Sequence, residues 1–214
     1  MLKQINQPDI KRYLCDNKDS IKKLNSFTYL NESYNVNDNI VLSLYDAKKK
    51  SATYFAKLLS VIIIPETEGK NIMPLLEVQF YFSREHLDCR YKTTIDHISI
   101  SELFLSDLIE FTALNSLIGK FKLYGLEDYI SSLEDQDIKF CQATIDTHTG
   151  NISPKLESRK KICYCKKIEN PDFNYILCES CDQWFHYFCV GIQETVNVTN
   201  IHFKCKNCEL NSNN

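Results

Sequence analysis

Glycine is scarce in this sequence, and no two glycines lie close together. The 214 residues include five glycines, Gly69, Gly119, Gly125, Gly150 and Gly191. Loops that cradle phosphate groups need several glycines within a few residues, so no nucleotide-binding loop of this kind is expected. Four histidines outside the main ligand pattern show no motif that pairs them with a nucleophile: His86, His97, His148 and His202. We therefore predict that the chain is not an enzyme.

Long apolar runs and an excess of positive charge are also missing. The longest apolar run, residues 61–64, stops at Pro65, whereas a membrane-spanning helix needs about 20 apolar residues. Residues 1–6 carry no apolar run of signal-peptide length. The 25 Lys and Arg residues face 28 Asp and Glu, a net charge of −3. We expect a soluble, intracellular protein without a membrane partner, whose contact with DNA is at most weak, because nucleic-acid affinity depends on clustered basic residues.

Cysteine, in contrast, is abundant and clustered. Seven of the ten cysteines lie within residues 163–208 in close pairs, together with a histidine, a pattern that favours metal binding over disulfides. The eight candidate ligands form four pairs: Cys163 and Cys165, Cys178 and Cys181, His186 and Cys189, Cys205 and Cys208. Zinc takes four such ligands tetrahedrally, so the pairs predict two complete sites, one of three cysteines and a histidine and one of four cysteines. Such closed sites are structural.

The region before the cysteines has the pattern of a β-rich domain. Strands are expected over residues 39–45, 54–64, 75–83, 102–105, 120–124 and 138–146, with one helix over residues 126–133. In residues 75–83 the apolar side chains alternate with polar ones, so Leu76, Val78, Phe80 and Phe82 share one face. Short strands with one helix predict a small bent sheet or barrel.

The predicted organisation has five parts. These are a polar helical extension, a β-rich domain, a basic linker, a zinc finger and a disordered tail, over residues 1–26, 27–150, 151–161, 162–210 and 211–214.

The ligand spacing resembles that of the plant homeodomain (PHD) finger, which interleaves its ligand pairs. The resemblance implies that Cys163, Cys165, His186 and Cys189 share one zinc ion and Cys178, Cys181, Cys205 and Cys208 the other. Phe203, two positions before the last pair, matches a further mark of the family. RING-type ubiquitin ligase fingers share the cross-brace, but in them the histidine usually stands fourth, and here it is fifth.

Many PHD fingers bind the amino-terminal tail of histone H-three, and the resemblance carries this expectation to three residues. Trp184 and Tyr175 match aromatic walls of a trimethyl-lysine cage, and Glu179 matches an acidic residue that pairs with a histone arginine. Where tight binders often place another cage tyrosine, this sequence has Glu169, and Phe173 is a candidate replacement. The alternative is that Trp184 and Tyr175 only pack against the zinc scaffold.

Four pieces of the β-rich region resemble the bromo-adjacent homology (BAH) domain: residues 34–38, 54–58, 80–82 and 102–107, the last followed by residues 118–120. The resemblance implies a mainly β chain, with a BAH domain followed by a two-zinc PHD finger, as in short plant-type proteins. It also implies a second trimethyl-lysine cage with Tyr54, Phe80 and Phe82 as walls. Phe80 stands where the family usually has tryptophan, and Phe80 and Phe82 could equally be core residues.

The combined resemblance implies a nuclear reader of chromatin with two structural zinc ions. Its expected partners are the histone H-three tail of a nucleosome and subunits of chromatin complexes. The finger would recognise trimethylated lysine four, and the BAH domain trimethylated lysine twenty-seven. A scaffold that does not read methylation and a RING-like ubiquitin ligase remain the alternatives.

Overall fold

A computed structural model describes most of the chain: residues 7–45, 50–64, 74–87, 95–132, 138–195 and 201–211. The chain divides into two compact units. The first comprises Met1–His86 and Ser101–Asn151, and the second comprises Leu87–Ile100 and Ile152–Asn214. The second unit therefore joins a segment that precedes residue 101 to the carboxyl-terminal part of the chain. No helix in the described ranges is long and apolar enough to cross a membrane.

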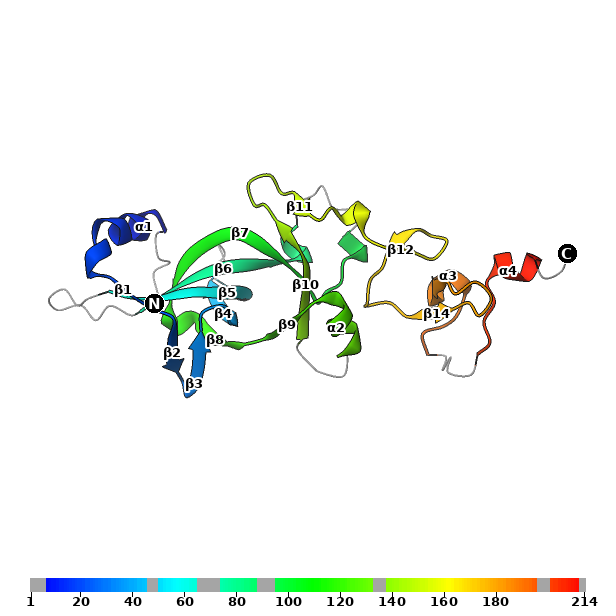
Figure 1. The fold of residues 1–214 in the computed structure, drawn as a ribbon, viewed down its shortest axis with the longest axis horizontal. Coiled ribbons are helices and arrows are strands. Elements are labelled where there is room, and N and C mark those ends of the chain that lie inside the picture. Colours follow the sequence, from blue (N-terminus) through cyan, green and yellow to red (C-terminus); the bar gives the residue numbers. More distant parts are fainter. Residues whose placement is uncertain are drawn as a thin grey trace. The chain divides into compact units, whose positions relative to one another are not determined.

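The first unit is built on a curved sheet whose long strands lie side by side (Figure 1). In spatial order its main path contains β10 (Ile138–Ile145), β7 (Glu102–Ala113), β6 (Leu75–Ser83), β5 (Ser51–Ile63), β4 (Asn39–Tyr45) and β8 (Leu117–Lys120). Neighbours from β7 to β8 pair antiparallel, whereas β10 pairs parallel with β7 and with β9 (Lys122–Tyr124). The shorter elements of this unit are β2 (Ser26–Tyr29), β3 (Glu32–Asn35), η2 (Arg84–His86), η5 (Leu114–Ser116) and α2 (Leu126–Ser131).

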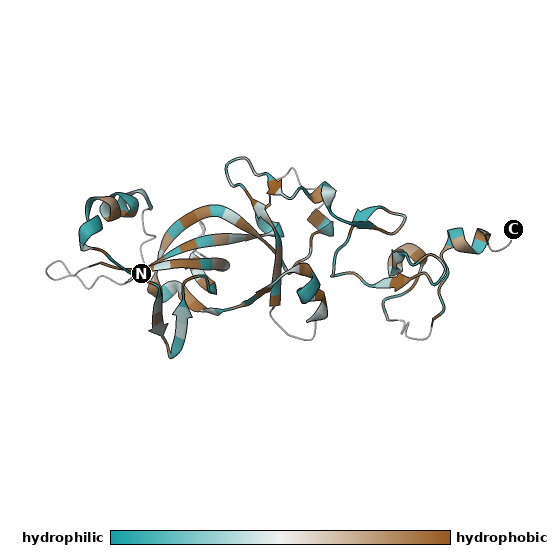
Figure 2. Ribbon diagram, in the orientation of Figure 1, coloured by the Kyte–Doolittle hydropathy of each residue, from teal (hydrophilic) through white to brown (hydrophobic). Residues whose placement is uncertain are grey.

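The core of this sheet follows from the alternation of β6. Leu76, Val78 and Phe80 are buried in one apolar cluster, and Phe82 packs against it partly buried. Figure 2 shows the corresponding change between hydrophobic and hydrophilic residues along the long strands. Successive side chains of a strand point to opposite faces. The predicted shared face of β6 is therefore confirmed.

The amino-terminal segment is helical only in part. It contains α1 (Gln7–Asp16) and η1 (Lys18–Ser20), followed by β1 (Lys22–Leu24), which pairs with β5 in the sheet. Ile10 and Leu14 of α1 pack against a buried cluster that includes Phe111. The segment predicted as a helical extension thus also supplies a strand.

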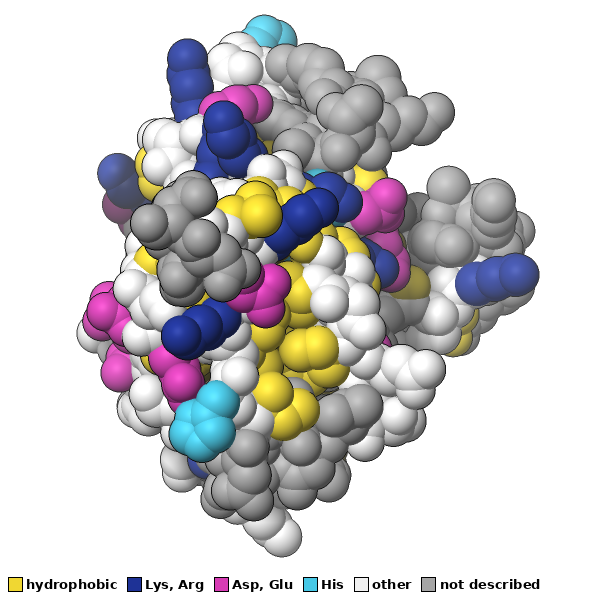
Figure 3. Space-filling view, turned by 90° about the vertical axis from the view of Figure 1, so that its right-hand side faces the viewer, with side chains coloured by type: hydrophobic (Ala, Val, Ile, Leu, Met, Phe, Trp, Pro, Cys, Tyr) yellow, Lys and Arg dark blue, Asp and Glu magenta, His cyan; other side chains and the backbone are white. Residues whose placement is uncertain are grey.

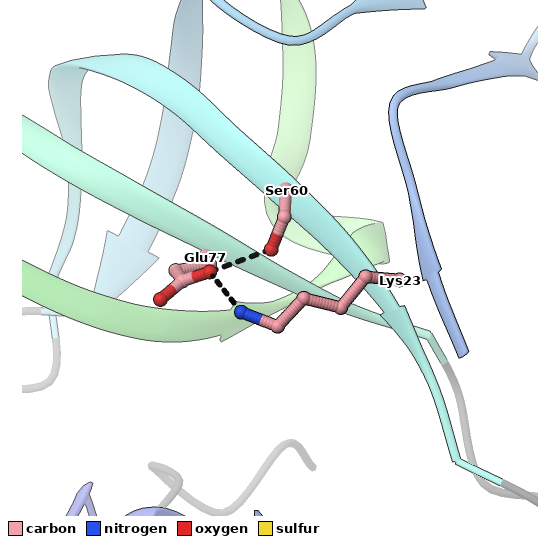
Figure 4. A network of polar contacts seen from close by, with 3 residues as sticks. All are labelled: Lys23, Ser60 and Glu77. Carbon is pink, nitrogen blue, oxygen red and sulfur yellow. Dashed lines mark hydrogen bonds and ion pairs between the residues drawn. The ribbon is translucent and has the colours of Figure 1, made fainter. Parts of the chain in front are cut away.

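A carboxylate connects β1 to the strands beside it (Figure 4). Glu77 on β6 accepts hydrogen bonds from the Ser60 hydroxyl at 2.6 Å and from the Lys23 ammonium at 2.9 Å. Desolvation by burial would raise the pKa of Glu77, but these two donors outweigh it and lower the pKa below its ordinary value of 4.5. The ionised carboxylate is therefore the form that holds the three strands together.

The second unit has short elements connected by loops. They are η4 (Ile95–His97), β11 (Ile152–Ser153), η6 (Leu156–Ser158), β12 (Lys161–Ile162), β13 (Lys167–Ile168), β14 (Tyr175–Leu177), β15 (Trp184–His186), α3 (Tyr187–Val190) and α4 (Lys206–Asn211). The segment predicted as a linker contains β11 and η6, and Leu156 within it is buried. The predicted boundaries of the five parts stay predictions. The predicted fold class, a mainly β bent sheet with a small two-site finger, is confirmed.

Candidate functional site

The eight predicted metal ligands converge in two groups of four. Within each group the ligand atoms all lie within 4.8 Å of one another. The first group consists of Cys163, Cys165, His186 and Cys189, and the second of Cys178, Cys181, Cys205 and Cys208. These are the interleaved pairs that the family resemblance implied. Each group has the donors and the number of ligands of a closed structural zinc site.

In the first group the imidazole of His186 faces the thiols through Nδ1. This atom lies 3.4 Å from Sγ of Cys165 and 3.9 Å from Sγ of Cys189. The side chain is completely buried, and desolvation, together with the positive charge of Lys167, lowers its pKa. Burial therefore favours the neutral imidazole, which is the form that ligates metal ions.

In the second group the backbone favours a thiolate at Cys178. Burial alone would raise the pKa of this thiol, but the backbone N–H groups of Cys205, Ser180 and Cys181 lower it to about 6. The Cys205 N–H donates to the Cys178 sulfur at 3.2 Å. Zinc binds the thiolate form of cysteine, so this group is prepared for metal binding by its own loop.

Each group also needs a cation, because its thiols cannot all be ionised alone. A hydrogen bond with Cys205 is the largest cause, and desolvation the next, of a pKa of Cys208 that is raised to about 12. Desolvation and the neighbouring thiols Cys163 and Cys165 raise the pKa of Cys189 to about 12. A divalent ion placed among the sulfur atoms removes this like-charge conflict. The two groups therefore fit two structural zinc ions.

The hairpin of β14 and β15 connects the two groups and has two different faces. Ile176 and Phe185 lie opposite each other in the register and are buried, and Phe203 packs against the Phe185 ring at 5.9 Å. The other face carries the pairs Tyr175 with His186 and Leu177 with Trp184. The two predicted cage residues of the finger thus lie diagonally on the same face of one hairpin.

The two predicted cage residues differ in exposure. Trp184 is 45% exposed, whereas Tyr175 is half-buried with its ring centroid 4.8 Å from that of His186. The Tyr175 hydroxyl donates to the Asn170 carbonyl at 2.9 Å and accepts from the Asn170 N–H at 3.0 Å. Burial raises the pKa of Tyr175 to about 12. Tyr175 is therefore a neutral side chain held in place beside a more accessible tryptophan.

Exposed apolar side chains occur in both units, and Figure 3 shows one face of the molecule on which hydrophobic side chains gather in a patch with charged ones around it. Phe188, like Trp184, is among those exposed. Phe173, the candidate replacement wall, lies with its ring centroid 5.7 Å from those of both His186 and Phe188. Glu169 instead forms an ion pair with Lys160 at 3.4 Å.

Glu179, the predicted contact for a histone arginine, already has a partner in the chain. Its carboxylate lies 2.7 Å from Nδ1 of His202. Its backbone N–H donates to the Phe203 carbonyl at 3.0 Å, which holds the loop after Cys178 in place. Both side chains of the pair are exposed to solvent, so an arginine can reach the carboxylate but competes with His202 for it.

In the first unit the other three predicted cage residues line one cavity of about 780 Å³. The Tyr54 and Phe80 rings meet edge to face at 6.1 Å. Phe80 is only 6% exposed and belongs to the sheet core, whereas Tyr54 and Phe82 are partly buried at its margin. Phe80 is thus a core residue that also reaches the cavity, and the role of Tyr54, Phe80 and Phe82 as cage walls stays a prediction.

Two features were not found from the sequence. The His86 ring lies beside Tyr54 and Phe82 in the cavity. In the second unit, Asp172 of the finger accepts hydrogen bonds from the Ser99 hydroxyl at 2.5 Å and the Ile100 N–H at 2.8 Å. For His86, its position three residues after an aromatic strand was the available signal. For Asp172 and Ser99, 73 residues apart in the chain, the sequence offered none.

Comparisons with known proteins agree with this arrangement. Residues 163–208 match the family model for the PHD-finger. The chain is 26% identical to the chromatin remodeling protein SHL of Arabidopsis thaliana over 200 residues, which are 90% of this chain and 81% of that protein. It is also 26% identical to the chromatin remodeling protein EBS of the same plant over 193 residues, 87% of this chain and 76% of that protein.

Among solved structures, the yeast Rsc2 BAH domain matches with a TM-score of 0.39 and 13% identity, over 57% of this chain and 50% of that one. Residues 163–208 are therefore a PHD finger, and over most of its length the chain is similar to the two plant chromatin remodeling proteins.

Proposed function

We propose that this chain is a nuclear reader of chromatin. Its finger binds the histone H-three tail trimethylated at lysine four, and the cavity of its first unit binds trimethylated lysine twenty-seven. The names of the two plant relatives, which are chromatin remodeling proteins, support the chromatin context. The chain acts by binding and not by catalysis at its metal ions, because both metal groups have a full set of four ligands. Its further partners are subunits of chromatin complexes.

The single observation that carries the finger's role is the exposure of Trp184. An aromatic residue that only packed on the zinc scaffold would be buried, as its neighbour Phe185 is. Trp184 instead presents its ring on the same hairpin face as Tyr175. A trimethylammonium group has no hydrogen to donate, so an aromatic face binds it through cation–π attraction, worth about 0.5–2 kcal/mol.

The remaining contacts of the tail follow from the small sheet of the finger. An extended peptide can add as a further strand to an exposed sheet edge, and β14 and β15 form a sheet of only two strands. Glu179 would then pair with a tail arginine after exchanging its contact with His202. Trp184 would separate the groove for the methylated lysine from the groove for the arginine.

Calorimetric titration of the full chain with tail peptides tests this function. The peptides are unmodified or trimethylated at lysine four. The expected result is a preference for the trimethylated peptide that falls about 2- to 30-fold in Trp184→Ala, which corresponds to the cation–π range above. Trp184→Phe keeps an aromatic face and should keep part of the preference, while Leu210→Ala, an exposed apolar control in α4, should keep all of it.

The other outcomes point to other functions. Equal affinity for both peptides would show that Trp184 and Tyr175 do not form a cage. No binding to either peptide would favour a scaffold that holds chromatin proteins together without reading methylation. Zinc content should stay at two ions per chain in every variant, so a loss of binding cannot be explained by a loss of the finger fold.

A further inference from the structure

His86 borders the cavity of the first unit together with the three predicted walls. It ends η2, directly after β6, and its ring centroid lies 5.3 Å from that of Phe82 and 6.1 Å from that of Tyr54. Tyr54 in turn meets Phe80 at 6.1 Å. Four rings thus form a connected group on the lining of one cavity.

The tautomer of His86 follows from its contacts with Ser83. The Ser83 backbone N–H lies 3.1 Å from Nδ1 of His86, and the Ser83 hydroxyl lies 2.9 Å from the same atom. A backbone N–H can only donate, so Nδ1 must accept and carries no proton. The neutral ring therefore holds its proton on Nε2. Protonation of Nδ1 would turn this acceptor into a donor that faces another N–H.

The charges around the cavity suit a cation. Glu110 on β7 is the one carboxylate among the described lining residues, and no Lys or Arg belongs to this lining. The other titratable groups on the lining are the phenols of Tyr45 on β4, Tyr54 on β5 and Tyr81 on β6, of which Tyr54 lies beside the His86 ring. Arg84 and Glu85 precede His86 in its own turn. A positive charge on His86 would be a new cation in the aromatic lining itself.

We propose that His86 is the fourth wall of this cavity and makes its binding of a quaternary ammonium group sensitive to pH. In the neutral state the ring adds an aromatic face next to Phe82 and Tyr54. In the protonated state it repels the cation and loses the hydrogen bond that the Ser83 backbone N–H donates to Nδ1. This inference rests on the proposed binding of trimethyl-lysine by the first unit, and it adds a condition to it: binding occurs at neutral pH and is lost on acidification.

The test uses the full chain carrying Trp184→Ala, which removes the cage tryptophan of the finger. The probe is a short peptide with one trimethyl-lysine that lacks the histone amino terminus. Histidine changes charge between about pH 5 and 8, so we expect affinity to fall at least about fivefold from about pH 7.5 to about pH 5.5. His86→Phe supplies an aromatic ring that does not titrate, so its affinity ratio between the two pH values should be below about twofold.

The outcomes separate this inference from the proposed function. If the peptide binds and His86→Phe keeps the same pH dependence, the role of His86 is refuted and the methyl-lysine site stands. If the chain carrying only Trp184→Ala fails to bind the peptide at neutral pH, as the chain that also carries Tyr54→Ala does, the site and the role of His86 are both refuted. Binding that is lost in Tyr54→Ala, with a pH dependence removed by His86→Phe, supports both.

Discussion

Removal of zinc should unfold the finger and leave the sheet of the first unit folded. The apolar core of the finger is small: Ile176, Phe185 and Tyr187 are its buried non-cysteine members. Burial of such side chains stabilises by about 1.5–3 kcal/mol each, which is less in total than the about 10–16 kcal/mol that structural zinc contributes to a small finger. The sheet has its own core of buried aliphatic and aromatic residues, so it does not depend on the metal.

Hydrogen exchange of individual amides measures this difference. In the finger, the Cys178 N–H donates to the Gln183 carbonyl at 2.9 Å, and in the same unit the Ile100 N–H donates to Asp172. Both amides should lose protection after chelation, because their acceptors lie in the finger. The Leu58 N–H, which donates to the Asp38 carbonyl in the sheet unit at 2.9 Å, should remain protected.

Substitution of single cysteines provides the matched control. Cys178→Ser removes a buried ligand and should reduce the zinc content measured by native mass spectrometry, with the same loss of protection. Cys15→Ser changes an exposed cysteine of α1 outside both groups and should leave both ions bound. Protection of Cys178 and Ile100 that survives chelation would refute the reasoning, as would a simultaneous loss at Leu58.

Three further changes test separate contacts. Phe104→Ala removes a fully buried ring of the sheet and should lower the free energy of unfolding by about 3–5 kcal/mol; a urea titration showing less than about 1 kcal/mol would contradict the packing. Because the folded pKa of Glu77 is lowered from 4.5, its stabilising contribution is complete above that value and is lost as the pH falls through the lowered pKa. The stability difference between the parent chain and Glu77→Gln should therefore shrink below pH 4.5, and a difference constant with pH would argue against the ionised contact. His202→Ala frees the Glu179 carboxylate and should raise tail affinity about 1.4- to 5-fold, the range of an exposed ion pair; unchanged affinity in calorimetry would mean that the two do not compete.

Local patterns were enough to predict much of the sheet. The ranges predicted for residues 39–45 and 75–83 coincide with β4 and β6, because β4 is rich in leucine and β-branched residues and β6 alternates between apolar and polar ones. In contrast, β7 extends to Ala113, well beyond the predicted residues 102–105. Asp107 and Glu110 interrupt its apolar pattern, and the Asp107 carboxylate is satisfied by the N–H and hydroxyl of Thr147 at 2.8 and 2.7 Å. A partner 40 residues away is invisible to local periodicity.

Partners that are distant in the sequence also explain why β1 and the contacts of Ser99 and Ile100 with the finger were not predicted. Lys22 and Lys23 carry no strand signal, yet β1 pairs with β5, and Lys23 reaches Glu77 on β6. The hydrogen bonds of Asp172 to Ser99 and Ile100 also connect distant positions. The metal groups could be predicted although they too are assembled from distant residues, because zinc restricts both the kind of ligand and its spacing.

The exposure of each aromatic residue decides whether its substitution reports on folding or on binding. Phe80 lies in the sheet core, so Phe80→Ala would lower stability together with any binding and could not separate the two. Trp184 and His86 are exposed, and substitutions of exposed side chains change the stability of a fold little. The residues best suited to test recognition are therefore those that the fold needs least, and a loss of binding in them without a loss of stability can be assigned to the aromatic face itself.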